Sequence, residues 1–188
     1  QIILRRFAVW SFIVELILAE SWLSFARQSS IPELLSFHGF PSALALGLGL
    51  AIVVALLSRA FFSRFTPQLI SELFVPIFGR VSISTLLLIS LLPGLGEEIL
   101  FRGVLQAEIG LVGASLIFGL MHSGFSPRLL PYGLWSALVG LSLGTLYLAT
   151  GNLWGSIAAH SLVNALGVLW IRQLVKTGVV RKDGSCEP

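Results

Sequence analysis

The sequence predicts an all-α protein, a polytopic bundle of transmembrane helices with about six spans and one interfacial helix. Only 11% of the 188 residues are charged, against about 25% in an ordinary soluble domain. Hydrophobic residues make up 55% of the chain before its 19 glycines are counted, and the mean hydropathy is +0.92. This composition excludes a soluble globular domain, because too few polar side chains are present to cover the apolar ones. It also excludes a disordered chain, which needs low hydrophobicity and high charge.

Six apolar segments have the length of roughly 20 residues that a membrane helix needs. The predicted spans cover residues 7–26, 40–58, a segment that begins near 81, and residues 109–124, 129–149 and 153–171. A shorter apolar run at 66–78 contains Glu72. We expect an interfacial helix there, with a short seventh span as the alternative.

The chain is predicted to form a single domain. The transmembrane domain covers residues 1–176, with a motif-bearing core at 81–171, and a polar C-terminal tail follows at 177–188. Cys186 in this tail is the single cysteine of the chain, so we expect no intramolecular disulfide.

Basic residues predict the orientation of the spans. With the N-terminus placed on the cytoplasmic side, ten of the 12 Lys and Arg residues fall on that side, and Arg27 and Arg102 fall on the other. Such an excess of cytoplasmic cations is typical of multi-pass membrane proteins. We therefore expect both termini in the cytoplasm, in a bacterial plasma membrane or an organellar membrane. The net charge of +3 does not indicate nucleic acid as a partner, because the basic residues are spread between apolar segments.

Several ionisable and polar side chains are predicted to lie at one depth in the membrane. A charged side chain at mid-membrane costs about 2.5–3.5 kcal/mol on insertion scales. Glu97 and His122 both lie roughly 18–20 Å from the turn expected between the third and fourth spans. Measured from the next outer turn, His160 lies about 13 Å deep and Asn164 about 20 Å deep. These four residues are therefore expected to meet near the middle of the bundle.

Spacing along the third span predicts separate roles for two adjacent glutamates. Glu98 and Arg102 are four residues apart, so they share a helix face and can form an ion pair. Glu97 lies about 100° around the helix from Glu98, so it can face a cavity while Glu98 is held by Arg102. Two carboxylates in unlike environments are typical of sites that perform acid–base chemistry. Two further pairs have the same four-residue spacing: Phe118 with His122, and His160 with Asn164.

Three motifs give the chain a resemblance to a known family. Residues 96–103 read GEEILFRG and match an EExxxR motif, residues 118–122 match FxxxH, and residues 160–164 match HxxxN. In this order, on separate predicted membrane helices, they resemble the CPBP family of CAAX-processing and bacteriocin-processing intramembrane proteases. The resemblance covers roughly residues 81–171.

The resemblance implies a hydrolase, a glutamate-dependent endopeptidase embedded in the membrane. Glu97 would activate a water molecule with help from His122. His160 and Asn164 would stabilise the oxyanion, for which amide and imidazole N–H groups are suitable donors. The supporting residues would be Glu98, Arg102 and Phe118. The implied partners are membrane lipid and a peptide or protein substrate, with or without a lipid modification.

The family implies no cofactor, although zinc bound by Glu97, His122 and His160 is a minority alternative. Other functions stay open at this point. The chain could be a non-catalytic scaffold or a bacteriocin-immunity protein of the same family. A haem protein could use the two histidines as axial ligands, and a proton-coupled transporter could use membrane carboxylates as a relay. Glu15 and Glu20 on the first span have no obvious partner, and we expect them to be structural or to face a lumen.

Overall fold

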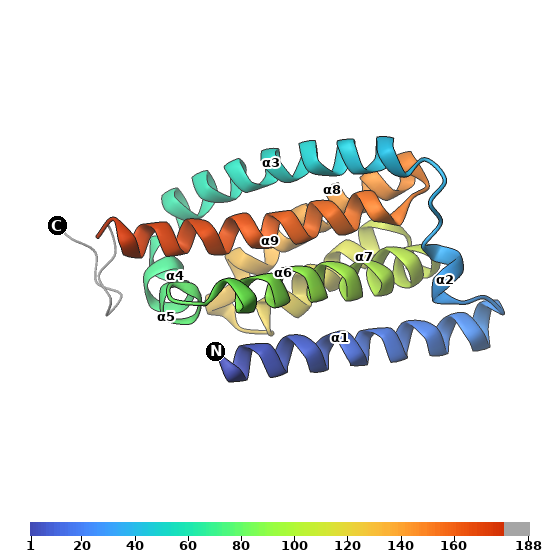
Figure 1. Ribbon diagram of the computed structural model, residues 1–188, viewed down its shortest axis with the longest axis horizontal. Helices are drawn as coiled ribbons and strands as arrows, with labels where there is room; N and C mark the ends of the chain where they lie inside the picture. Colours follow the sequence, from blue (N-terminus) through green and yellow to red (C-terminus); the bar gives the residue numbers. More distant parts are fainter. Residues whose placement is uncertain (179–188) are drawn as a thin grey trace.

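The computed structural model describes residues 1–178, and every regular element in that range is helical. Long helices lie side by side in a bundle (Figure 1). In chain order the elements are α1 (Ile2–Trp22), η1 (Leu23–Arg27), α2 (Ile31–Leu34), α3 (Phe40–Phe65), α4 (Pro67–Leu69), η2 (Ile70–Phe74), α5 (Val75–Phe78), α6 (Ile83–Glu98), η3 (Ile99–Leu105), α7 (Gln106–Ser123), η4 (Pro127–Leu129), α8 (Leu130–Thr150) and α9 (Leu153–Lys176). The predicted all-α class is confirmed. Cys186 and nearly all of the predicted polar tail lie outside the described residues.

Four helical stretches are long and apolar enough to cross a membrane. They are Phe40–Phe65, Ile83–Ser123, Pro127–Thr150 and Leu153–Lys176. The stretch Ile83–Ser123 contains two of the predicted spans. They are separated at Gly110, where the backbone leaves the helical conformation with φ 76° and ψ 170°. The polypeptide turns there, and α7 packs against η3 and α8. These stretches account for five of the six predicted spans. The first predicted span corresponds to α1 and η1, which are not among the four.

The apolar run that precedes α6 forms a short helical segment, Pro67–Phe78, made of α4, η2 and α5. Its 12 residues would extend about 18 Å as a helix, whereas the hydrocarbon core of a membrane is about 30 Å thick. This length excludes the alternative of a seventh span. The helical character is as predicted, and its position at a membrane surface stays a prediction.

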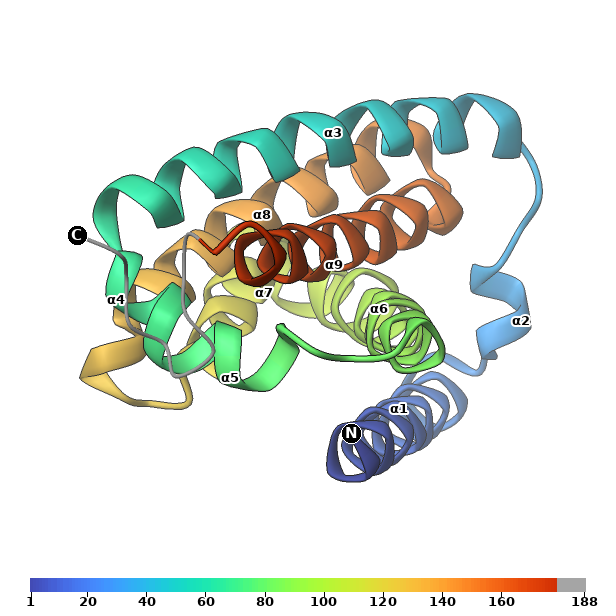
Figure 2. The ribbon, with the colours of Figure 1, turned by 60° about the vertical axis from the view of Figure 1, so that its left-hand side comes forward.

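The central helix α9 lies between α3 on one side and α6 on the other (Figures 1 and 2). Glycines allow the close approach of α3 to α9. A Cβ atom at Gly47 would overlap with the backbone carbonyl of Gly155, and a Cβ atom at Gly155 would lie 2.6 Å from the carbonyl oxygen of Ala43. Small residues at such crossings let membrane helices pack through their backbones.

The first helix, α1, packs on α6 and η3 and lies at the edge of the bundle (Figure 2). Near its start, the Arg5 Nε donates a hydrogen bond to Thr85 Oγ1 over 2.7 Å. Just beyond its end, the Arg27 Nε donates to Glu108 Oε1 over 2.7 Å, and the Trp22 indole donates to the same oxygen over 3.2 Å. Polar contacts therefore fix α1 at both ends of the third predicted span.

We predict that the substitution Gly47→Leu destabilises the bundle while Gly49→Leu does not. A side chain at Gly47 meets backbone atoms of α9 that cannot move aside, whereas a Cβ atom at Gly49 meets nothing within 4 Å. Overpacking of this kind costs about 1–3 kcal/mol. Thermal unfolding of the two detergent-purified variants measures the difference. Equal melting temperatures would show that the α3–α9 crossing is not tightly packed.

Candidate active site

Glu97 and Glu98 lie in the last turn of α6, where the backbone changes to the π-helix η3 at Ile99. Single π-helical turns inside longer helices are frequent at functional sites. The two carboxylates have different environments, as their spacing predicts. The Glu98 side chain is fully buried, and the Glu97 side chain is 18% exposed within a cleft.

The buried Glu98 carboxylate joins three helical elements. Its Oε1 lies 3.0 Å from Arg102 Nη1 and 2.7 Å from His160 Nδ1. The Arg102 Nη2 donates a hydrogen bond to the carbonyl of Gly140 on α8 over 3.0 Å, and the guanidinium lies over the ring of Phe118 at 4.7 Å. The predicted pairing of Glu98 with Arg102 is confirmed. The count of Arg102 among the outer-side cations is wrong, because its side chain is only 2% exposed and is held inside the bundle.

A second side chain binds a backbone carbonyl of α8 one helical turn beyond Arg102, on the same helix face. The Gln106 Nε2 donates to the carbonyl of Gly144 over 3.1 Å. Gln106 follows Arg102 by four residues, and Gly144 follows Gly140 by four, so two side chains bind two successive turns of α8. A Cβ atom at Gly144 would overlap with the Gln106 amide. The small residues of α8 therefore expose backbone carbonyls that hold η3 and α7 in register.

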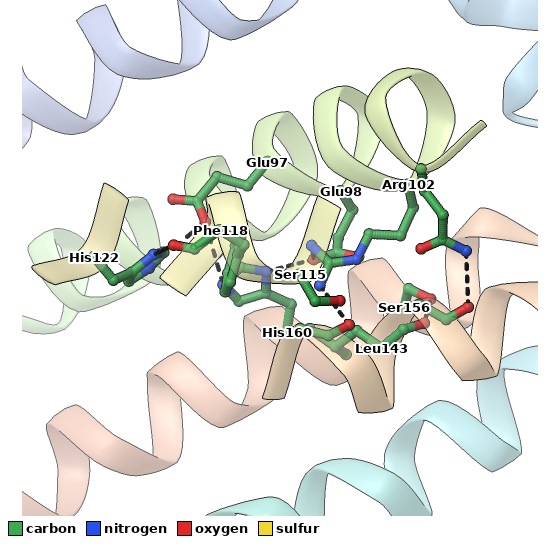
Figure 3. Close-up of polar contacts among 12 residues, drawn as sticks. Glu97, Glu98, Arg102, Ser115, Phe118, His122, Leu143, Ser156 and His160 are labelled. Atoms are coloured by element: carbon green, nitrogen blue, oxygen red, sulfur yellow. Dashed lines mark hydrogen bonds and ion pairs between the residues drawn. The ribbon is translucent and has the colours of Figure 1, made fainter. Parts of the chain in front are cut away.

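The Glu97 carboxylate faces two imidazole rings (Figure 3). Its Oε2 lies 3.8 Å from His122 Nε2 and 3.9 Å from His160 Nε2. Both distances are longer than a direct hydrogen bond, and Glu97 Oε2 has no hydrogen-bond partner among residues 1–178. The three side chains come from α6, α7 and α9, and the sequence predicts this convergence.

Backbone and carboxylate acceptors orient both rings. The carbonyl of Phe118 accepts a hydrogen bond from His122 Nδ1 over 2.8 Å, one turn back along α7. Because a carbonyl can only accept, the neutral His122 ring has its proton on Nδ1 and a lone pair on Nε2. Glu98 accepts in the same way from His160 Nδ1. Each Nε2 atom is therefore directed toward Glu97.

The site lies in a cleft with a volume of about 780 Å³. Glu97, His122, His160 and Asn164 line it together, so the structure also brings the fourth predicted residue to the cleft. Its remaining walls are largely apolar and include Phe62, Phe74, Phe78, Tyr132, Trp135 and Trp170. Leu56 and Met121 at its edge are 60% and 59% exposed. In a membrane, exposed apolar side chains such as these would face lipid.

Glu15 of α1 lines the same cleft, which the sequence does not predict. Its buried oxygen Oε2 has no hydrogen-bond partner within the described residues, and the carboxylate packs over Gly96, next to Glu97. The one signal in the sequence is a carboxylate inside an apolar span. Glu20, by contrast, accepts a hydrogen bond from the backbone N–H of Ile31 over 3.0 Å, which is a structural contact.

Within residues 1–178, no group of three or more His, Cys, Asp or Glu side chains has the geometry of a metal site. Glu97 lies 3.8 and 3.9 Å from the two imidazoles, whereas ligands of a tetrahedral zinc ion lie about 3.3 Å apart. The zinc alternative would need the three side chains to move closer together.

The fold and the site define a helical integral membrane protein with a buried ion pair beside a Glu–His–His cluster. Comparison with known proteins specifies this class further. The family described as type II CAAX prenyl endopeptidase Rce1-like matches residues 79–166, which include every motif residue of the site. A stretch of 128 residues, 67% of the chain, is 36% identical to the uncharacterized protein YpbD of Bacillus subtilis (strain 168) and covers 67% of that protein. The chain belongs to the Rce1-like family. No solved structure gives a significant match.

We predict that Arg102→Met strongly destabilises the protein, by about 3–5 kcal/mol, because it leaves the buried Glu98 carboxylate without its cation. Arg128→Met is the matched control, since Arg128 forms an exposed ion pair with Glu72 and exposed pairs contribute little. Denaturant unfolding in detergent compares the two variants. A similar loss of stability in both would contradict a central role for the buried pair.

Proposed function

We propose that the chain is an intramembrane endopeptidase that hydrolyses a peptide bond with a water molecule activated by Glu97. The observation that carries the proposal is the Glu97 carboxylate, which faces the Nε2 atoms of His122 and His160 in an apolar cleft. The family supports a CAAX-protease-like membrane endopeptidase. Peptide hydrolysis needs a water, a base and donors directed at the developing negative charge, and the cleft contains residues for each role.

Glu97 and His122 together would activate the water. The 3.8 Å separation of Glu97 Oε2 and His122 Nε2 is too long for a direct hydrogen bond, so both atoms keep their capacity to bind a third polar atom. A water between them can donate one hydrogen bond to the carboxylate and one to the imidazole lone pair. Glu97 then takes a proton as the water oxygen attacks the carbonyl carbon of the substrate.

His160 and Asn164 would stabilise the oxyanion. Glu98 accepts a hydrogen bond from His160 Nδ1, so the Nε2 atom that faces the cleft donates to an oxyanion when the ring is doubly protonated, as an imidazolium paired with Glu98. Asn164 lies one helical turn further along α9 and lines the same cleft, where its amide can donate. Donors held in place before the reaction act without reorganisation, which is why such groups contribute strongly to catalysis.

The apolar walls of the cleft favour a substrate with an apolar segment near the cleaved bond. The aromatic rings that line it suit either a hydrophobic peptide or a lipid-modified one, and the lipid-facing edge at Leu56 and Met121 gives such a substrate a route from the membrane. The substrate would then approach from within the bilayer.

The excess of Lys and Arg at one end of the predicted spans supports cytoplasmic termini.

We predict that Glu97→Gln abolishes cleavage of a diverse pool of quenched peptides, lowering the rate by about 100-fold or more, because the amide cannot accept a proton. Glu33→Gln is the control, since Glu33 is exposed and accepts a hydrogen bond from Ser30 on the short helix α2. Both purified variants should unfold at the wild-type temperature. Each is assayed with and without a chelator. Inhibition of the wild type by the chelator would favour the zinc mechanism, and equal activity of Glu97→Gln and the wild type would exclude Glu97 as the base.

We further predict that Asn164→Ala lowers kcat by about 100- to 1,000-fold and leaves KM nearly unchanged. An oxyanion donor acts mainly on the transition state, so its loss reduces the rate of the chemical step rather than substrate binding. Steady-state kinetics on one peptide from the pool separates the two parameters. A raised KM with an unchanged kcat would assign Asn164 to ground-state binding instead.

A further inference from the structure

Glu15 is the one carboxylate that α1 contributes to the cleft, on a helix face that also includes Leu4, Ala8 and Ser11. The side chain reaches over Gly96, where the absence of a Cβ atom leaves room for the carboxylate beside the α6 backbone. Its Oε2 is buried and has no hydrogen-bond partner within residues 1–178. Such a group is costly in an apolar environment unless a ligand or a proton satisfies it.

Around Glu97, the side chains from the walls of the cleft include more carboxylates than unpaired cations. Glu97 and Glu98 come from α6 and Arg102 from η3, and the cation is already bound to Glu98 and to a carbonyl of α8. The Glu15 carboxylate packs against Gly96, the residue that precedes Glu97. The other titratable groups that line the cleft are His122 on α7, Tyr132 on α8 and Arg59 on α3, whose guanidinium lies 5.7 Å from the ring of Trp170. Among the described residues, neither Glu15 nor Glu97 forms an ion pair with Lys or Arg.

Peptide hydrolysis generates a cation at this place. The oxygen of water bonds to the carbonyl carbon, the C–N bond breaks, and its electron pair stays on nitrogen. Both protons of the water finish on that nitrogen, so the products are a carboxylate and an ammonium group. A cleft with an unpaired carboxylate is complementary in charge to the ammonium product. It is also complementary to the leaving nitrogen at the earlier stage, when that nitrogen is gaining its protons.

We propose that Glu15 binds the amino group of the released peptide, as a product-side contact that holds the leaving nitrogen beside Glu97. The inference rests on the proposed function and deepens it, since it assigns the leaving-group side of the cleft to α1. Glu97 and the two histidines occupy the wall formed by α6, α7 and α9. The cleft thus has its water-activating groups on one wall and an anionic acceptor for the amine on another.

The test measures binding of two probes to the intact, detergent-purified protein. One probe is the tripeptide Leu-Leu-Leu with a free amino terminus, and the other is the same peptide with an acetylated amino terminus. Each is titrated against wild type, Glu15→Gln, Glu15→Asp and Glu20→Gln. Glu20 is the matched control on the same helix, because its backbone hydrogen bond can also be accepted by an amide oxygen. Thermal unfolding checks that all variants remain folded.

We expect the wild type to bind the free amine more tightly than the acetylated peptide. Glu15→Gln should lose roughly tenfold of that preference, because it removes a hydrogen bond between charged groups. Glu15→Asp should recover part of it, and Glu20→Gln should keep it. A wild type without preference for the free amine, or a Glu15→Gln variant that binds both peptides as the wild type does, overturns the inference. Equal weakening of both peptides in Glu15→Gln also overturns it, since that would indicate a structural role.

Cleavage of the quenched-peptide pool by the wild type, run in parallel, separates this inference from the proposed function. Cleavage without amine preference means that the assignment of Glu15 is wrong and the endopeptidase stands. Amine preference without cleavage of any peptide in the pool means that Glu15 binds a cation as inferred and that the endopeptidase function is not supported.

Discussion

The buried ion pair between Glu98 and Arg102 is the interaction on which the rest of the site depends. A carboxylate and a guanidinium inside an apolar bundle are each costly, and their mutual attraction compensates only if other partners satisfy their remaining hydrogen-bonding groups. Here His160 binds Glu98 Oε1, and the Gly140 carbonyl and the Phe118 ring contact the guanidinium, while Glu98 Oε2 has no hydrogen-bond partner among residues 1–178. One charge pair therefore links α6, η3, α7, α8 and α9. A displacement of any of these helices would break one of the contacts to this buried pair, which favours a single arrangement of the helices.

This constraint explains how two neighbouring glutamates acquire different roles. Glu98 points into the bundle and uses its charge to hold Arg102 and to orient His160. Glu97 lies about 100° further around the helix and faces the cleft, where two imidazoles approach it without a direct hydrogen bond. The Phe118 carbonyl orients the second imidazole from α7. Both imidazoles that face Glu97 are thus oriented through their Nδ1 atoms, and groups oriented in advance are what a preorganised site requires.

Much of this arrangement could be predicted from the sequence, because helix geometry converts residue spacing into depth and direction. The rise of a helix places Glu97, His122 and His160 at one level, and the four-residue spacing pairs Glu98 with Arg102. The contact of His160 with Glu98 could not be derived in this way, since it depends on how closely α9 packs against α6, where a Cβ atom at Gly94 would overlap with Ser161. The π-helical turn at Ile99 also has no clear sequence signal. Glu15 was missed for a related reason: nothing within the first span indicates which face of α1 meets the cleft.

The position of α1 shows why contacts far apart in the sequence matter most here. At one end of α1, Arg5 binds Thr85 near the start of α6. At the other end, Trp22 and Arg27 bind Glu108, which follows Thr85 by more than 20 residues. These two contacts set the register of α1 along the third predicted span. Between these ends the absence of a side chain at Gly96 leaves the space that the Glu15 carboxylate occupies. A helix held only by apolar packing against lipid-like surfaces could slide or rotate, because lipid offers similar contacts. Polar contacts at both ends prevent this and keep the Glu15 carboxylate beside Glu97. The edge helix, which carries no part of the three motifs, therefore has polar contacts that set its register against the helices that do.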